Sequence, residues 1–163
     1  MNTAQIIRLL ENDPVTREHF EGVFASDRLP ETVRRLPSCV VFNTAPLGRH
    51  GHWIALYINS AGEGSYMDSY GRAPRRQFLN FLKRNCADVE YNTRRLQGHL
   101  TTTCGYYCMV FLVWMCRGGR MTDFVEKFTD DLPLNDYSIT KTINKLYNVQ
   151  FKVVDASFYS TLL

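Results

Sequence analysis

Two hydrophobic patterns alternate along the chain and predict an order of helices and strands. Apolar residues spaced three and four apart predict amphipathic helices, whereas short apolar runs between turn residues predict buried strands. Helices are expected at residues 3–12, 74–85, 104–117, 122–128 and 138–147. Strands are expected at residues 39–43, 53–59, 66–69 and 89–95, while residues 23–37 look irregular and the tail from residue 149 is ambiguous.

This order is typical of an α+β fold, in which helices cover the faces and ends of one sheet. A turn at residues 60–65 would join two strands into an antiparallel hairpin. We therefore expect a mixed, mainly antiparallel central sheet packed against a long helix that begins at Cys104. The chain has 163 residues and is 45% hydrophobic, enough for a single domain over residues 1–163.

Composition and charge change this picture little. Aromatic residues make up 13% of the chain, which argues against global disorder, and a net charge of +3 does not by itself demand a nucleic-acid partner. The first residues lack the apolar stretch of a secretion signal, and no window has the roughly 20 apolar residues of a membrane span. With five cysteines, an odd number, we expect a soluble protein with reduced thiols.

Cys104 is the candidate nucleophile. It follows three threonines at the end of a polar loop and opens the apolar run that predicts a helix. A helix N-terminus stabilises a thiolate because its free N–H groups and its dipole favour negative charge. The alternative is a buried core cysteine, which suits Cys108 and Cys116 better because both lie within the apolar helix.

A thiol that attacks a carbonyl needs a base and a group that orients the base. His52, at the start of a predicted strand, is the candidate base, and His50 and His99 are its competitors. Asp68 lies in the next strand of the predicted hairpin, which would bring it near His52. The alternative for Asp68 is a carboxylate satisfied by local backbone.

Gln97 is the candidate donor to the oxyanion. It lies seven residues before Cys104, and its side-chain amide would act together with the backbone N–H of Cys104. A glutamine in a loop is otherwise normally solvated, so the prediction depends on this spacing. The cysteines and histidines do not have a recognisable zinc spacing, and we predict no metal site.

In chain order, His-Trp, Asp, Gln and Cys-Gly resemble the pattern of the adenovirus endopeptidase family, cysteine peptidases related to the ubiquitin-like-protein proteases. The resemblance covers roughly residues 1–120, and residues 20–30 look like viral and virus-like-transposon members. Adenovirus enzymes commonly carry Glu where Asp68 stands. The ubiquitin-like-protein proteases have Asp there, but they usually also have Asp where this chain has Thr103, which favours the viral branch.

The resemblance implies a cysteine-proteinase-like architecture with catalytic roles for His52, Asp68, Gln97 and Cys104. It implies a thiol endopeptidase that cleaves viral or virus-like capsid precursors at glycine-containing sites during particle maturation. The expected location is the virion, or the nucleus or cytoplasm of a host cell, and we expect a monomer without a membrane partner. The alternatives are an isopeptidase acting on ubiquitin or a ubiquitin-like modifier, and a non-catalytic binding module.

The chemistry itself would need no cofactor, but the resemblance implies two activators. Cys86 lies eleven residues before Gln97, where some adenovirus enzymes form a disulfide with a short viral peptide; the alternative is a core cysteine at a helix end. The adenovirus enzymes also use DNA as a cofactor, and here basic residues crowd residues 72–95. We expect non-specific, salt-sensitive DNA binding, with a solvated helix face as the alternative. The basic residues are Arg72, Arg75, Arg76, Lys83, Arg84, Arg94 and Arg95.

Overall fold

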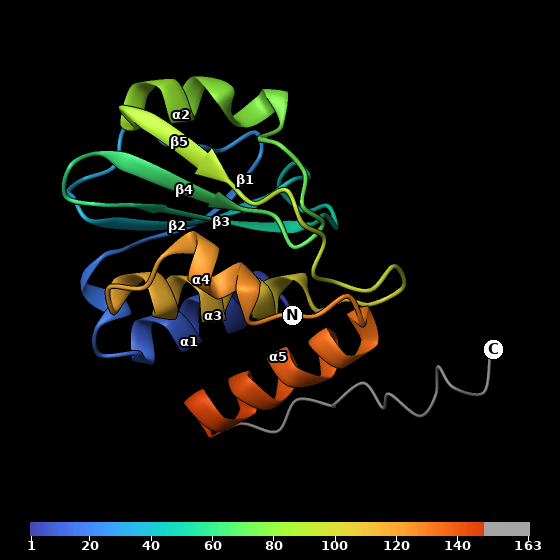
Figure 1. Ribbon diagram of the computed structural model, residues 1–163. Helices are drawn as coiled ribbons and strands as arrows, with labels where there is room; N and C mark the ends of the chain where they lie inside the picture. The colour runs from blue at the N-terminus through green and yellow to red at the C-terminus, as the bar shows by residue number, and fades with distance from the viewer. Residues whose placement is uncertain (149–163) are drawn as a thin grey trace.

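The computed structural model describes residues 1–148 and contains a five-stranded sheet with helices on both faces (Figure 1). The strands follow one another across the sheet in chain order. The central pairings, β2 with β3 and β3 with β4, are antiparallel, and the edge pairings, β1 with β2 and β4 with β5, are parallel. The predicted α+β fold with a mixed sheet is confirmed. The strands are β1 (Phe20–Ala25), β2 (Ser38–Asn43), β3 (Trp53–Ile58), β4 (Glu63–Met67) and β5 (Asp88–Tyr91).

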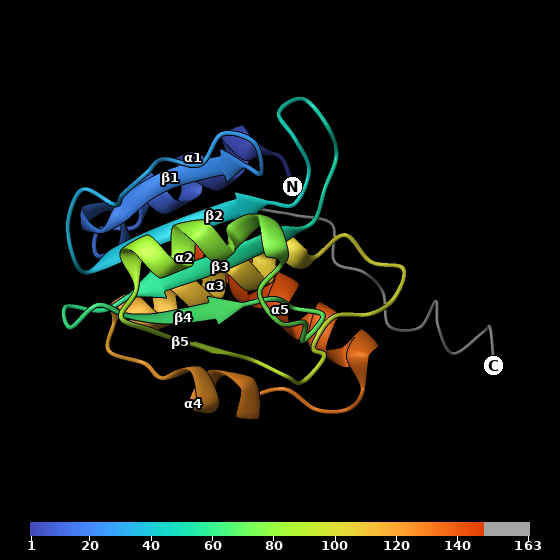
Figure 2. The same ribbon diagram turned by 90° about the horizontal axis from the view of Figure 1, so that it is seen from above.

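Helix α2 covers one face of the sheet, and α1, α3 and α5 lie on the other (Figures 1 and 2). Two hydrophobic clusters correspond to these two faces. The helices are α1 (Thr3–Asn12), α2 (Leu79–Asn85), α3 (Cys104–Cys116), α4 (Met121–Glu126) and α5 (Leu132–Tyr147), with short 3₁₀ helices at Thr16–Glu18 and Arg76–Phe78.

Helix α3 is the central helix of the larger cluster. Its residues are apolar on nearly every side, which is typical of a helix buried among other elements. Tyr107, Phe111 and Leu112 are fully buried between the sheet and the outer helices. The core therefore fixes α3 against β3, and with it the position of Cys104 at the N-terminal end.

The hairpin of β3 and β4 brings two distant residues to the same end of the sheet. Ala55 pairs with Met67 in antiparallel register, so the residue before β3 and the residue after β4 lie close together. These residues are His52 and Asp68. Asp68 follows the strand instead of lying within it, because β4 begins at Glu63 and ends at Met67, both earlier than predicted. The turn is shorter than expected because the Asn59 side chain accepts the backbone N–H groups that close it.

Further boundaries differ from the sequence prediction, among them the end of β5, which lies at Tyr91 and not at residue 95. Strand β1 covers part of the segment expected to be irregular; it is a half-buried edge strand whose register shifts next to Gly22. Helix α5 begins six residues earlier than expected because Asp131 caps it and Pro133 occupies its first turn, where a backbone N–H has no helical partner. The helix expected from residue 74 begins at Arg76 as a 3₁₀ turn.

The predicted ambiguous tail lies outside the described residues. Within residues 1–148, no helix has the length and apolar character needed to cross a membrane.

Candidate active site

Cys104 is the first residue of α3 and lines a cleft of about 880 Å³. His52, Trp53 and Tyr70 line the same cleft, together with Thr101 and Thr102. Cys104 is partly exposed, unlike Cys108, which is fully buried in the same helix. The predicted nucleophile is therefore open to the cleft, and the alternative of a sealed core cysteine is not what the structure shows.

His52 and Asp68 form a close pair beside this thiol. The Nε2 atom of His52 lies 2.6 Å from Oδ1 of Asp68, and the side chains are 10% and 0% exposed. The same Oδ1 accepts a hydrogen bond from the Tyr70 backbone N–H at 2.8 Å. Because Nε2 is engaged by the carboxylate, Nδ1 is the ring nitrogen left for the thiol. The hairpin thus brings together the base and the acid that the sequence predicted.

The pKa values of Cys104 and His52 move in opposite directions. Burial disfavours the thiolate, but the hydrogen bond and charge of His52, with backbone hydrogen bonds from Trp53 and Gly105, lower the pKa of Cys104. Burial also disfavours the imidazolium, but hydrogen bonds to Asp68 and Cys104 raise the pKa of His52. These shifts favour a thiolate–imidazolium pair, which is the reactive form of a catalytic cysteine.

The backbone around His52 is fixed from both sides. Its N–H donates to Oγ1 of Thr44, and its carbonyl accepts from the Thr44 N–H, each at 2.9 Å. The preceding residue, Gly51, approaches the chain so closely that a Cβ there would collide with the amide oxygen of Asn43. These contacts hold the imidazole at the rim of the cleft.

Asn92 is a site residue that sequence reasoning missed. Its Oδ1 accepts the backbone N–H of Asp68 at 3.0 Å, and its Nδ2 donates to the Asp68 carbonyl at 2.7 Å. Asn92 is buried, and it follows β5 directly. An asparagine after a strand usually indicates a turn, so the local sequence gave no signal of this long-range contact.

Tyr70 forms a stack with the predicted base. Its ring lies 4.5 Å from that of His52 at an interplanar angle of 17°. The guanidinium carbons of Arg72 and Arg95 lie 5.0 and 4.5 Å from the centre of the Tyr70 ring. Arg72, predicted to bind nucleic acid, is therefore placed close to the His52–Asp68 pair.

Gln97 is buried on the loop that leads to α3. Its Nε2 donates to the Thr101 carbonyl at 2.8 Å, and its Oε1 accepts from the Ser69 hydroxyl at 2.7 Å. Within the described residues, the lining of the cleft includes Thr101 and Cys104 but not Gln97. Its role as an oxyanion donor stays a prediction.

The competing histidines do not replace His52. His50 lines the exposed rim of the cleft, and His99 is exposed on the loop before α3. Within the described part of the chain, the histidine bonded to Asp68 is His52. This geometry favours His52 as the base.

Cys86 and the basic residues Arg76, Lys83 and Arg84 lie in or next to α2, on the opposite face of the sheet from α3, whereas Arg72 and Arg95 lie over Tyr70, which lines the cleft. Cys86 is half-buried at the C-terminal end of α2, and burial raises its pKa to about 11. Of the basic residues, Arg72, Arg76, Lys83 and Arg84 are exposed, and Arg75 is half-buried. Arg84 lies 3.9 Å from Glu31, and Arg94 pairs with Asp130 at 2.8 Å.

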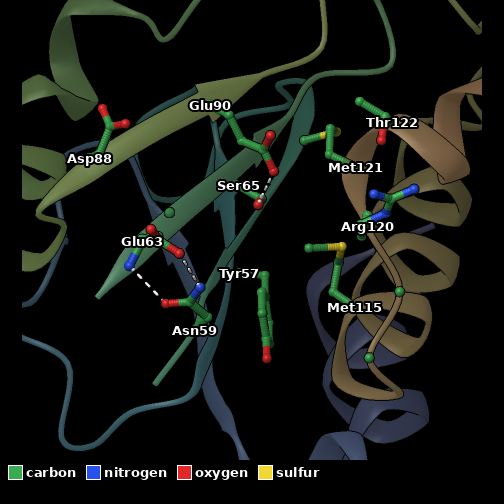
Figure 3. A pocket seen from close by; sticks show the side chains of 13 residues that line it. Tyr57, Asn59, Glu63, Ser65, Asp88, Glu90, Met115, Arg120, Met121 and Thr122 are labelled. Carbon is green, nitrogen blue, oxygen red and sulfur yellow. Dashed lines mark hydrogen bonds between the residues drawn. The ribbon is translucent and has the colours of Figure 1, made fainter. Parts of the chain in front are cut away.

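A second pocket, of about 450 Å³, shares no lining residue with the cleft (Figure 3). It lies between the β4–β5 edge and the C-terminal end of α3, where Figure 3 shows Glu63, Asp88 and Glu90 on the strands and Arg120 across from them. Ser65 donates to Glu90 at 2.6 Å within it. The catalytic residues predicted from the sequence all lie elsewhere. Among the described residues, no group of three metal-ligating side chains is present in either place.

The fold and the pairing of a helix-terminal thiol with a buried His–Asp pair define the arrangement of a cysteine peptidase. The chain is 31% identical over 130 residues to the protease of Human adenovirus D serotype 17, covering 67% of this chain and 58% of that protein. It is 30% identical over 112 residues to the protease of Bovine adenovirus B serotype 3, covering 58% and 51%. The predicted resemblance to the adenovirus endopeptidases is confirmed. The chain spans less than two thirds of the length of these relatives.

Solved structures similar to this one include the ASFV pS273R protease, at 18% identity and a TM-score of 0.49, covering 70% of this chain and 45% of that chain. ChlaDub1 from Chlamydia trachomatis matches at 18% identity and a TM-score of 0.43, covering 66% and 52%. No protein-family model matches the chain.

Proposed function

We propose that this protein is a cysteine endopeptidase that cleaves peptide bonds through an acyl-thioester intermediate. The observation that carries the proposal is the position of Cys104 at the start of α3 beside His52, which Asp68 holds at 2.6 Å. A thiol, an imidazole and an orienting carboxylate are the groups that nucleophilic attack on a carbonyl requires. The identity with the adenovirus proteases supports the same activity.

In the proposed reaction, the Cys104 thiolate attacks the scissile carbonyl carbon, and the carbonyl oxygen becomes an oxyanion. The backbone N–H of Cys104, the first of α3, can donate to this oxygen, with the Gln97 amide as the predicted additional donor. The C–N bond breaks as the imidazolium of His52 gives its proton to the leaving amine. Water then attacks the thioester while His52 takes its proton, which releases the carboxylic acid and the free enzyme.

The proposed substrates are capsid precursor proteins of a virus or virus-like element, cut at glycine-containing sites during particle maturation. The support is the similarity to proteases of adenoviruses. Subsites too narrow for a Cβ would enforce glycine by steric exclusion. The corresponding location is the virion or the infected host cell. An isopeptidase that removes a ubiquitin-like modifier would use the same chemistry, so substrate tests must separate the two.

The first experiment compares cleavage of capsid precursors by the wild-type protein and by Cys104→Ala, with products identified by mass spectrometry. We expect Cys104→Ala to abolish cleavage while circular dichroism shows an unchanged fold. His52→Ala and His50→Ala form a matched pair, because both histidines line the cleft but only His52 contacts Asp68. Turnover by Cys104→Ala, or equal losses in the two histidine variants, would contradict the assignment.

A second experiment addresses the substrate class. The wild-type protein is offered glycine-site peptides and, in parallel, probes that carry ubiquitin or ubiquitin-like modifiers. The proposal expects cleavage of the peptides, and preferential reaction with a modifier probe would identify an isopeptidase instead.

Regulation by a peptide at Cys86 is part of the proposal, and the spacing to Gln97 is its support. The raised pKa of Cys86 leaves little thiolate at neutral pH, so disulfide formation would need the peptide to bind first. Activity of Cys86→Ser is compared with that of the wild type, with and without an oxidant and the candidate peptide. Equal behaviour of the two proteins in all conditions would remove this activator site.

DNA binding by the basic residues near α2 is the remaining part of the proposal. Exposed arginine and lysine side chains would contact phosphates, so affinity for duplex DNA should fall as salt rises. The test measures the Kd of the wild-type protein between low and moderate salt, with Arg76→Ala and Arg84→Ala as variants. A Kd that does not change with salt would remove the electrostatic contribution.

A further inference from the structure

Asp136 of α5 is a fully buried carboxylate that binds three donors around the loop before Cys104. Its Oδ1 accepts from the Thr103 hydroxyl at 2.7 Å and from the Tyr107 hydroxyl at 3.1 Å. Its Oδ2 accepts from the backbone N–H of Gly98 at 3.0 Å. Within residues 1–148, Asp136 has no ion-pair partner at contact distance, so neutral donors hold it.

A buried carboxylate is not a favourable means of stabilising a fold. Desolvation disfavours the charge, and well-packed apolar side chains of similar size often stabilise a protein at least as well. What the carboxylate adds is geometry, because its two oxygens fix the directions of three donors at once. Those donors come from Gly98 near one end of the loop, and from Thr103 and the first turn of α3 at the other.

The neighbouring residue of α5 holds the same loop. Asn135 is buried, and its Nδ2 donates to the carbonyl of Leu96 at 3.1 Å, one residue before Gln97. Helix α5 therefore contacts the segment on both sides of Gln97 and again at the residue before Cys104. The residues next to the predicted oxyanion donor and next to the nucleophile are thus hydrogen-bonded to one helix.

The lack of a side chain at Gly98 permits one of these contacts. A Cβ at this position would lie 2.7 Å from Oδ2 of Asp136, which is closer than a side chain can pack. The absence of a side chain at Gly98 is what lets the loop backbone reach the carboxylate.

We propose that Asp136 is a positioning residue, which holds the loop of residues 97–103 and the N-terminus of α3 in the geometry that binds the oxyanion. The inference rests on the proposed peptidase function. Asp136 is fully buried and does not line the cleft, so it would act through Gly98 and Thr103. A shift of about 1 Å in such a supporting group can lower the rate about 100-fold.

The test uses Asp136→Asn in the whole 163-residue chain, because the amide cannot accept all three hydrogen bonds. Hydrogen exchange of residues 97–103, followed by mass spectrometry, reports on the anchoring without any turnover. Alkylation of Cys104 by iodoacetamide, located by peptide mapping, reports on the thiolate but needs no oxyanion donor. Turnover of a glycine-site peptide gives kcat and KM.

We expect exchange in the loop to quicken at least tenfold and kcat to fall about 10- to 100-fold, with KM and Cys104 alkylation within twofold of wild type. Because Asp136→Asn could fail to fold, Thr103→Val and Thr103→Ser form a second pair. The valine removes one donor to Asp136, and the serine restores it. Ser138→Ala, on the exposed surface of the same helix, is the control.

Each outcome is decisive. Unchanged exchange in the loop of Asp136→Asn, or a Thr103→Val variant that behaves like Thr103→Ser, overturns the positioning role. Loss of alkylation in proportion to kcat, with a general drop in thermal stability, would mean that Asp136 serves the fold as a whole and also overturns it. If the wild type cleaves no peptide but loop exchange responds as expected, the peptidase function fails while the anchoring stands.

Discussion

The sulfur atoms of Cys39 and Cys116 lie 3.0 Å apart, although 77 residues separate them in the chain. Cys39 lies on β2, and Cys116 ends the helix that Cys104 begins. The hydrogen bond between the two thiols, together with burial, raises the pKa of Cys39, and the same bond lowers the pKa of Cys116. A thiol with thiolate character thus faces a second thiol within contact distance.

We predict that this pair is the first to be crosslinked when diamide oxidises the protein. The two thiols would lose two hydrogens to the reagent and form one disulfide, which closes a loop of 77 residues. Such a loop would stabilise the fold by about 4 kcal/mol and raise the Tm by roughly 10 °C. Non-reducing peptide mapping identifies the crosslink, and Cys39→Ser is the matched control. A crosslink between other cysteines would show that proximity does not decide the reaction.

Removing the charge of Asp68 should impair the base more than the fold. Asp68→Asn keeps the shape of the side chain but no longer holds the imidazole in the required tautomer, so we expect kcat to fall about 10²- to 10⁴-fold. The fold should remain, because the backbone of Asp68 stays bonded to Asn92. Peptide turnover and thermal melting measure the two effects. A variant with near wild-type kcat would show that Asp68 does not orient His52.

The opposite pKa shifts of Cys104 and His52 predict a pH window for thiol reactivity. The lowered pKa of Cys104 means that alkylation by iodoacetamide persists at pH values below the ordinary titration of a thiol. His52→Ala removes the interactions that lower this pKa and leaves the burial that raises it. Its alkylation curve should therefore move to higher pH, with at least a tenfold slower reaction at pH 7.

The charged forms of Cys104 and His52 also contribute to the free energy of unfolding, each with its own pH dependence. The thiolate contribution is present above the pKa of an unfolded cysteine and is lost as pH falls through the lowered pKa of Cys104. The imidazolium contribution is present below the pKa of an unfolded histidine and is lost as pH rises through the raised pKa of His52.

In the alkylation experiment, peptide mapping must separate Cys104 from Cys116, whose pKa is also lowered. Identical alkylation curves for Cys104 in the wild type and His52→Ala would contradict the pairing.

The juxtaposition of Cys104, His52 and Asp68 could be predicted because each of the three stands at a place that local sequence patterns indicate. The hairpin of two apolar strands brings His52 and Asp68 to one end of the sheet, and the apolar run after three threonines predicts a helix that starts at Cys104. Hydrophobic periodicity and turn-forming residues are local properties of the sequence, so they can be recognised without the structure.

The supporting residues could not be predicted for the opposite reason. Asn92 is hydrogen-bonded to Asp68, 24 residues away in the sequence, and Asp136 to Gly98, 38 residues away. Hydrogen bonds of this kind produce no periodic pattern in the sequence. Strand β1 was missed because a parallel edge strand pairs with a distant segment, and its half-buried residues do not alternate clearly. Long-range partners of single polar side chains become visible only with the fold.

Asn92 offers a test of how far such a supporting contact matters. Asn92→Ala leaves the buried backbone N–H and carbonyl of Asp68 without the two bonds that now hold them, at 3.0 and 2.7 Å. An unsatisfied buried polar group costs about 1–3 kcal/mol, so we expect the free energy of unfolding to fall by about 2–4 kcal/mol.

The same substitution should also lower kcat, because the Asp68 carboxylate would no longer meet His52 in a fixed direction. We expect a loss of about tenfold or more, beyond any change in the folded fraction. Urea unfolding and peptide turnover at a temperature where the variant is folded separate the two effects. Thr93→Ala, at the exposed neighbouring position, is the control for the local backbone. If Asn92→Ala lost stability but kept its kcat, Asn92 would support the strand end and not the acid, because the direction of the Asp68 side chain would then be set by Tyr70 and His52 alone.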